Sequence, residues 1–225
     1  DSGFLRGRHL VFGNRPQPDG RPGARRPVPY LPLQCPNGSR HRQEIDVTSA
    51  GSITEDPVSG ALKTSGLLQT NSTTGTLLNG PNAVDSFHAM NTVSGDISLT
   101  NTTTTLTVTG ITQTGGNIAV ANAGNLTTSG TVRDNTTGKL IRLTATGGDL
   151  TINAAITGTL TDTISLNTVT SGNIVVNGAV STGSGEIDVT STGQISQGSG
   201  AGSFKTTGLL KTNSFSGTVL NGANQ

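Results

Sequence analysis

The feature that most limits how this chain can fold is an internal repeat. Residues 44–82 align without a gap with residues 186–224, which lie 142 positions later, and 23 of the 39 aligned residues are identical. Most of the identical residues are Gly, Asn, Thr, Ser and aliphatic residues, which form turns and pack in cores. Only Glu44, Asp46 and Lys63 among them are charged. A duplicated catalytic motif would preserve nucleophiles, acids or metal ligands, so the repeat indicates a unit that stacks.

A shorter unit recurs between the two copies. It consists of Gly, then Asp, Asn or Glu, and then two aliphatic residues separated by one other residue. Its examples are GDISL from Gly95, GNIAV from Gly116, GDLTI from Gly148, GNIVV from Gly172 and GEIDV from Gly185. A period of two places both aliphatic side chains of a unit on the same side of a strand. The inward-facing pairs predicted in this way are Ile97/Leu99, Ile118/Val120, Leu150/Ile152, Ile174/Val176 and Ile187/Val189.

Weaker strands are expected between these units, at LTVTG from Leu106, LIRLTA from Leu140 and TISLNT from Thr163. Short strands separated by Gly, Asn and Ser turns, with no helical pattern, predict an all-β fold. A sandwich or barrel would need longer strands and a bulky inner layer, but only 3% of the residues are aromatic. A parallel β-solenoid needs only one or two aliphatic residues per strand, and it is the fold that we predict for residues 44–225.

The predicted solenoid has Thr and Asn side chains that form hydrogen-bonded ladders between coils about 4.8 Å apart. The short units follow one another at uneven steps, the second of which is the longest and the last the shortest. We interpret these uneven steps as coils of roughly 20 to 24 residues whose loops vary in length. Residues 45–225 would then form about eight coils.

Residues 1–43 form a separate segment by composition. Residues 1–44 contain eight Arg, no Lys and three acidic residues, whereas residues 45–225 contain six Lys or Arg and ten acidic residues. Seven of the nine Pro residues also precede residue 45. The segment has the composition of a basic arm for nucleic acid or an anionic surface, but we favour a flexible leader or a translation artefact. We therefore expect no nucleic-acid partner.

No residue pattern in the chain predicts a metal or cofactor site. Cys35 is the single Cys and has no partner within the chain for a disulfide. The three His residues, His9, His41 and His88, are scattered and do not have the spacing of zinc ligands. No run of about 18 apolar residues exists that would predict a transmembrane helix.

Catalysis by a β-helical polysaccharide lyase or hydrolase is an alternative function. Such enzymes need two or three carboxylates that converge in one groove. Asp96, Asp149 and Glu186 occupy the same turn position before a strand, so stacking of coils would be the way to bring some of them together. We favour turn residues that accept hydrogen bonds from backbone amides, and we expect no catalytic residue. The other acidic residues considered for such a groove are Asp162 and Asp188.

A third hypothesis, an ice-binding or crystal-binding surface, would need a Thr-x-Thr pair at the same place in every coil. The pairs Thr107/Thr109, Thr144/Thr146 and Thr168/Thr170 follow one another at unequal intervals along the chain. This spacing predicts that they are out of register.

Two turn motifs accompany the short strands. They are G-Q-I-S-Q at 193–197 and L-N-G-x-N at 78–82, the latter with a second copy at 220–224. With strands of the G-[DN]-[IL]-x-[IVL] type, they make residues 44–225 resemble the repeat regions of large bacterial exoproteins of the filamentous haemagglutinin type. The resemblance does not extend to residues 1–43, where the secretion domain of that family is not recognisable.

The resemblance implies a right-handed parallel β-helix in a secreted or cell-surface fibre. Proteins of this type leave the cell through an outer-membrane secretion partner or through their own carboxyl-terminal barrel, and they adhere to host cells or other bacteria. The repeat regions of the family have no catalytic residues to transfer to this chain. We therefore expect a fragment of an adhesive stalk, with a host-cell glycan or protein as receptor. The alternative within this class is a passive spacer without a binding role.

Overall fold

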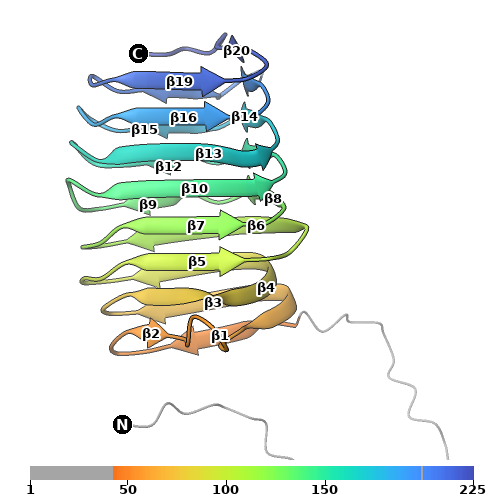
Figure 1. Cartoon of the computed structure of the whole chain (residues 1–225). Coiled ribbons are helices and arrows are strands. Elements are labelled where there is room, and N and C mark those ends of the chain that lie inside the picture. Colours follow the sequence, from red (N-terminus) through yellow and green to blue (C-terminus); the bar gives the residue numbers. More distant parts are fainter. Residues whose placement is uncertain (1–42, 199) are drawn as a thin grey trace, which may run out of the picture. The chain divides into compact units, whose positions relative to one another are not determined.

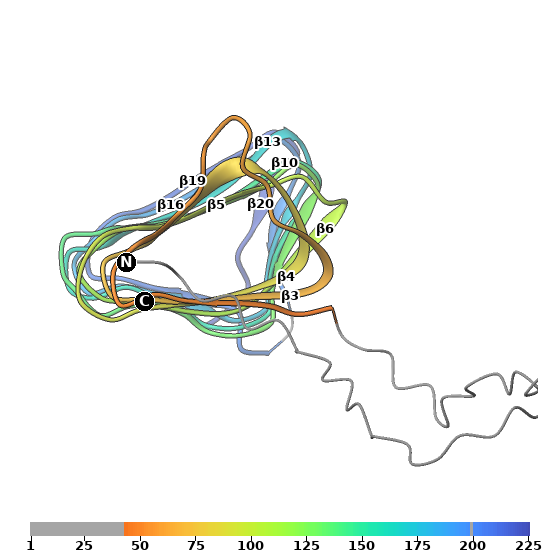
Figure 2. The ribbon, with the colours of Figure 1, turned by 90° about the horizontal axis from the view of Figure 1, so that it is seen from below.

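The computed structural model describes residues 43–198 and 200–225, and its strands stack in about eight turns of a β-solenoid (Figure 1). Among these residues every pair of neighbouring strands is parallel, and there is no helix. Seen from the N-terminal end of the solenoid, the chain runs clockwise as it moves away, so the coils are right-handed (Figure 2). The predicted fold class is confirmed.

Each coil has three sides, which give the solenoid a triangular cross-section (Figure 2). The front face contains β2 (Ile53–Thr54), β5 (Ile97–Asn101), β7 (Ile118–Asn122), β10 (Leu140–Gly147), β13 (Thr163–Ser171), β16 (Ile187–Ser191) and β19 (Leu210–Ser214). The side face contains β8 (Asn125–Thr128), β11 (Leu150–Ile152), β14 (Ile174–Val176), β17 (Ile195–Gln197) and β20 (Thr218–Val219). The rear face contains β1 (Ile45–Thr48), β9 (Val132–Asp134), β12 (Ile156–Thr157), β15 (Ala179–Ser181) and β18 (Ser203–Lys205).

Three longer strands bend around corners and contribute to more than one face. They are β3 (Lys63–Ser72), β4 (Thr76–Asn91) and β6 (Thr105–Gln113). The predicted weaker strands at 106, 140 and 163 correspond to β6, β10 and β13. The faces alternate inward and outward side chains because successive residues of a strand point to opposite sides.

The core consists of aliphatic columns that run parallel to the solenoid axis. On the front face Ile97 pairs with Ile118, and Ile118 pairs with Ile141 in the next coil. All three side chains are fully buried. All five predicted inward-facing pairs are buried as well. Because each coil places an apolar residue on the one below, a chain with few aromatic residues still forms a continuous core.

The uneven steps between the short units have a different cause from the one that we predicted. The units that begin at Gly95, Gly116 and Gly185 supply strands of the front face, whereas those at Gly148 and Gly172 supply strands of the side face. The longest and the shortest steps therefore occur where the pattern moves from one face to another. The later front-face coils have one constant length: Ile118 pairs with Ile141, Ile141 with Ile164, and Ile164 with Ile187, each 23 residues further on.

The two copies of the long repeat lie on different faces. Val47 of the first copy lies in the column of Val132 on the rear face, but its counterpart Val189 lies on the front face. Ile187 of the same strand belongs to the axial column of Ile53, which continues through Thr76, Ile97, Ile118, Ile141 and Ile164. The offset between the two copies is thus not a whole number of coils, and it rotates the second copy by one face.

The L-N-G-x-N turn of the first copy is held by a side chain of the preceding coil. Glu55 Oε1 accepts hydrogen bonds from the Gly80 amide and from Asn82 Nδ2, both at 2.6 Å. Asn82 Oδ1 in turn accepts a hydrogen bond from the Leu62 amide at 2.7 Å. The motif therefore joins two coils at a corner.

The second copy forms the same hydrogen bonds on its own face. Gln197 Oε1 accepts hydrogen bonds from the Gly222 amide at 2.7 Å and from Asn224 Nδ2 at 3.1 Å. Asn224 Oδ1 accepts one from the Phe204 amide at 2.9 Å. Because the local structure survives the change of face, the repeat encodes a strand–turn unit that more than one face can accept.

Polar ladders line the corners inside the solenoid, as predicted. Asn101 Nδ2 donates to Asn122 Oδ1 at 3.0 Å, and Asn91 Nδ2 donates to Gln113 Oε1 at 2.8 Å. Coils also approach closely at the turns: a Cβ on Gly185 would overlap the carbonyl oxygen of Asp162 in the preceding coil. Only glycine leaves room for the backbone there.

Candidate functional site

Two of the acidic residues proposed for a catalytic groove serve as turn residues. Asp96 Oδ1 accepts hydrogen bonds from the Asn117 amide at 2.7 Å and from Asn117 Nδ2 at 3.2 Å. Asp149 Oδ1 makes the same pair of bonds with Asn173, at 2.7 and 3.2 Å. Each carboxylate therefore joins its turn to the turn of the next coil, which is the role that we favoured.

The structure does not bring these carboxylates together. Asp96 and Glu186 both precede front-face strands, but four coil steps separate them, or roughly 19 Å at the usual strand spacing. Asp149 precedes a side-face strand. Asp188 points outward on the front face and forms an ion pair with Lys211 at 3.5 Å. Within residues 43–198 and 200–225 no group of three or more His, Cys, Asp or Glu is placed to hold a metal ion.

Changing the outward acidic residues should leave the solenoid almost unaffected. We expect Asp188→Asn and Glu186→Gln each to change the free energy of unfolding by about 0.5 kcal/mol or less, because exposed ion pairs contribute little. Urea unfolding followed by circular dichroism would measure this. A loss of polysaccharide-cleaving activity on either substitution would overturn the interpretation of these residues as turn and surface groups.

Asp162 is the only one of the five acidic residues that is fully buried. Its Oδ1 accepts a hydrogen bond from the Lys139 amide at 2.8 Å, and its Oδ2 accepts bonds from the Thr159 amide at 2.6 Å and the Thr159 hydroxyl at 3.2 Å. Its side chain also fills the space beside Gly158, where a Cβ would lie only 2.9 Å from Asp162 Cβ. Asp162 is therefore a structural residue of an inner corner.

A second carboxylate, Asp134, is buried in the same corner, and the sequence did not reveal it. Thr157 pairs with Arg133, so Gly158 stacks on Asp134 one coil away. Asp134 Oδ1 accepts a hydrogen bond from the Thr136 amide at 2.8 Å, but its buried Oδ2 has no hydrogen-bond partner in the structure. Burial raises the pKa of Asp134 to about 6, against the lowering effect of the Thr136 amide, and the charge of Asp162 raises it further.

The Thr-x-Thr pairs do not form one array. Thr107 lies where β6 pairs with β8 of the side face, opposite Thr127, whereas Thr144 lies on the front face opposite Asn167. Thr168 points inward and is almost fully buried. The prediction that these pairs are out of register is confirmed.

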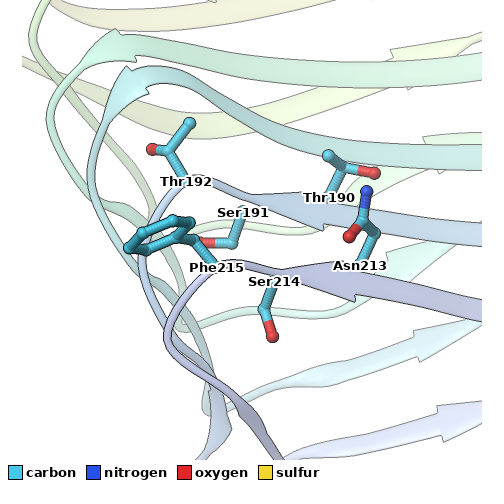
Figure 3. A pocket seen from close by; sticks show the side chains of 6 residues that line it. All are labelled: Thr190, Ser191, Thr192, Asn213, Ser214 and Phe215. Carbon is cyan, nitrogen blue, oxygen red and sulfur yellow. The ribbon is translucent and has the colours of Figure 1, made fainter.

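A shallow groove lies on the front face where β16 and β19 end (Figure 3). Thr190 and Asn213 form one of its walls, and Thr192 and Phe215 form the other. Its volume is about 380 Å³, and none of its lining side chains is charged. Ser191 and Ser214 complete the lining. Phe215 is 89% exposed, so the groove combines an accessible aromatic residue with hydroxyl and amide groups.

No short motif in the sequence predicts this groove, but the long repeat contains a signal for it. Phe215 aligns with Thr73 of the first copy, and Thr192 aligns with Ala50. The other four lining residues are identical in the two copies. The large aromatic Phe215 replaces Thr73 directly after three identical residues, and it is the largest change in side-chain size between the two turns.

Several residues considered in the sequence fall outside the described part of the chain. They are Cys35, His9, His41 and the Arg-rich segment. His88 lies on β4, and its imidazole ring lies close to Gly110 of the next coil. A Cβ on this glycine would come within 3.2 Å of the His88 ring. In residues 43–198 and 200–225 no helix exists that is long and apolar enough to cross a membrane.

Comparison of the chain with protein-family models, with curated proteins and with solved structures gives no match.

Proposed function

We propose that residues 44–225 belong to the repeat region of a secreted or cell-surface bacterial exoprotein similar to filamentous haemagglutinin, and that they form an adhesive stalk. The observation that supports this best is an axial row on the front face. It consists of small, uncharged outward side chains, one from each of six successive coils: Thr100, Ala121, Thr144, Asn167, Thr190 and Asn213.

Such a row suits adhesion because its contacts repeat. Five of the six residues, all except Ala121, offer a hydroxyl or amide group, which hydrogen-bonds to glycans or protein surfaces without the desolvation cost of charge. The neighbouring row carries three charges: Asp188 and Lys211 pair with each other, and Arg142 is exposed. A ligand that spans several coils would add many weak bonds into one stable attachment.

The first test measures adhesion directly. Surfaces coated with the full chain should retain epithelial or bacterial cells above an uncoated background, and Thr144→Glu, which places a charge in the row, should reduce retention. Thr157→Glu makes the same change on the rear face and is the matched control. Retention at background level by the unmodified chain would contradict adhesion and favour a passive spacer.

The second test concerns location. An antibody raised against residues 44–225 should label intact cells that produce the protein. Labelling only after the cells are made permeable would contradict a surface position, whatever the adhesion assay shows.

A further inference from the structure

Phe215 is placed differently from the other phenylalanines of the described chain. Phe87 and Phe204 are fully buried in the core, whereas Phe215 exposes 89% of its surface at the end of β19. Exposing an aromatic ring forgoes the free energy of burying it. An exposed aromatic ring next to hydrogen-bonding groups is typical of a contact that a ligand completes.

The exposure of Phe215 has two causes: it lies at an outward corner, and it follows β19, the last front-face strand of the described chain, whose side chains are all more exposed than those of β16. Asn167 pairs with Thr190, and Ser191 pairs with Ser214, so Val169, Thr192 and Phe215 follow the same strand ends in successive coils. Val169 has coils on both sides and is still 55% exposed, whereas Thr192 at the same corner is half-buried. Side chains at this corner therefore point away from the solenoid, and Phe215 forms an outward wall of the groove (Figure 3).

The lining selects for uncharged, hydroxylated ligands. The face of the Phe215 ring offers an apolar platform, while the Asn213 amide and the Thr190 hydroxyl on the opposite wall donate and accept hydrogen bonds. A pyranose ring has this combination, with an apolar face of C–H groups and a rim of hydroxyls. An anionic sugar would find no cation among the six lining residues.

We propose that Phe215, Asn213 and Thr190 form a subsite for one uncharged pyranose residue of a glycan. The inference rests on the proposed adhesive function and names its ligand class. The groove, at about 380 Å³, falls within the range of roughly 300–1,000 Å³ that small-ligand sites occupy. The pyranose would stack on Phe215 and hydrogen-bond to the opposite wall.

The first copy of the repeat supplies the matched comparison. Its equivalent turn keeps Asn71 and Thr48 but has Thr73 where the second copy has Phe215. Phe215→Thr therefore installs a residue that the same turn already accommodates. The variant should fold like the unmodified chain, so a change in binding can be assigned to the lost ring.

The experiment probes the full chain on an array that carries neutral oligosaccharides together with sialylated and sulfated ones. We expect binding to neutral glycans, a loss of about tenfold or more in affinity on Phe215→Thr, and retained binding on Phe215→Trp. Val169→Ala, which removes an exposed apolar side chain from the same corner, should leave binding unchanged.

Three outcomes would overturn the subsite: no binding to neutral glycans, binding only to the charged ones, or equal binding by the unmodified chain and Phe215→Thr. The cell-retention assay distinguishes a failure of the subsite from a failure of the proposed adhesive function. If both chains retain cells but bind neutral glycans equally, adhesion stands and the subsite fails. If neither retains cells, the adhesive function itself is contradicted.

Discussion

Replacing Phe87 with alanine is expected to lower the free energy of unfolding by about 3–5 kcal/mol. Phe87 is fully buried and stacks between Leu68 and Val108 of the neighbouring coils. The substitution removes most of a large side chain from a core with few of them, and it leaves a cavity that adjacent coils fill only in part. Urea unfolding monitored by far-ultraviolet circular dichroism would measure the loss.

Phe215→Ala is the matched control for this prediction. It makes the same chemical change at a side chain that is 89% exposed, so we expect a change of about 0.5 kcal/mol or less. Because each coil contacts only its neighbours, hydrogen exchange in Phe87→Ala should accelerate most in the coils around residue 87. Similar losses in the two variants would contradict the stacked core.

Replacing Asp134 with asparagine is expected to stabilise the solenoid at neutral pH and to remove part of its pH dependence. In the folded chain burial raises the pKa of Asp134 to about 6, from an ordinary value of 3.8. A raised pKa means that the folded state favours the protonated carboxyl. Its stability contribution is therefore fully present below about pH 3.8 and is lost as the pH rises through 6.

The size of this effect follows from the pKa difference. A shift from 3.8 to about 6 corresponds to roughly 3 kcal/mol of lost stability above pH 7, as an upper bound. We expect Asp134→Asn to recover much of it at pH 8 and to differ little from the unmodified chain near pH 4. Unfolding free energies measured in urea across this pH range would show the two curves converging at low pH.

Asp162→Asn provides the contrast in the same corner. The carboxylate of Asp162 accepts three hydrogen bonds, and an amide is unable to replace all of them because its nitrogen only donates. This variant should be destabilised at neutral pH by about 1–3 kcal/mol. A gain in stability from Asp162→Asn, or a loss from Asp134→Asn at pH 8, would show that the two carboxylates have been assigned the wrong roles.

Much of the local structure could be read from the sequence. Alternation in units such as Ile97/Leu99 identified the inward side chains, because a strand has a period of two whichever sheet it joins. The turn role of Asp96 and Asp149 followed from their position before a strand. The length of the coils was predictable because short strands and Gly-rich turns leave little room for variation.

The sequence by itself thus determined the strands, their inward faces and the stacking of short coils. Only the tertiary structure decided which face each strand occupies, because the three faces offer the same backbone geometry and the choice depends on the summed lengths of all earlier turns. That sum places Ile187 above Ile53 and not above Ile45. It also brings Asp134 and Asp162 into one corner and sets Phe215 across a groove from Thr190, contacts between residues that no local pattern connects.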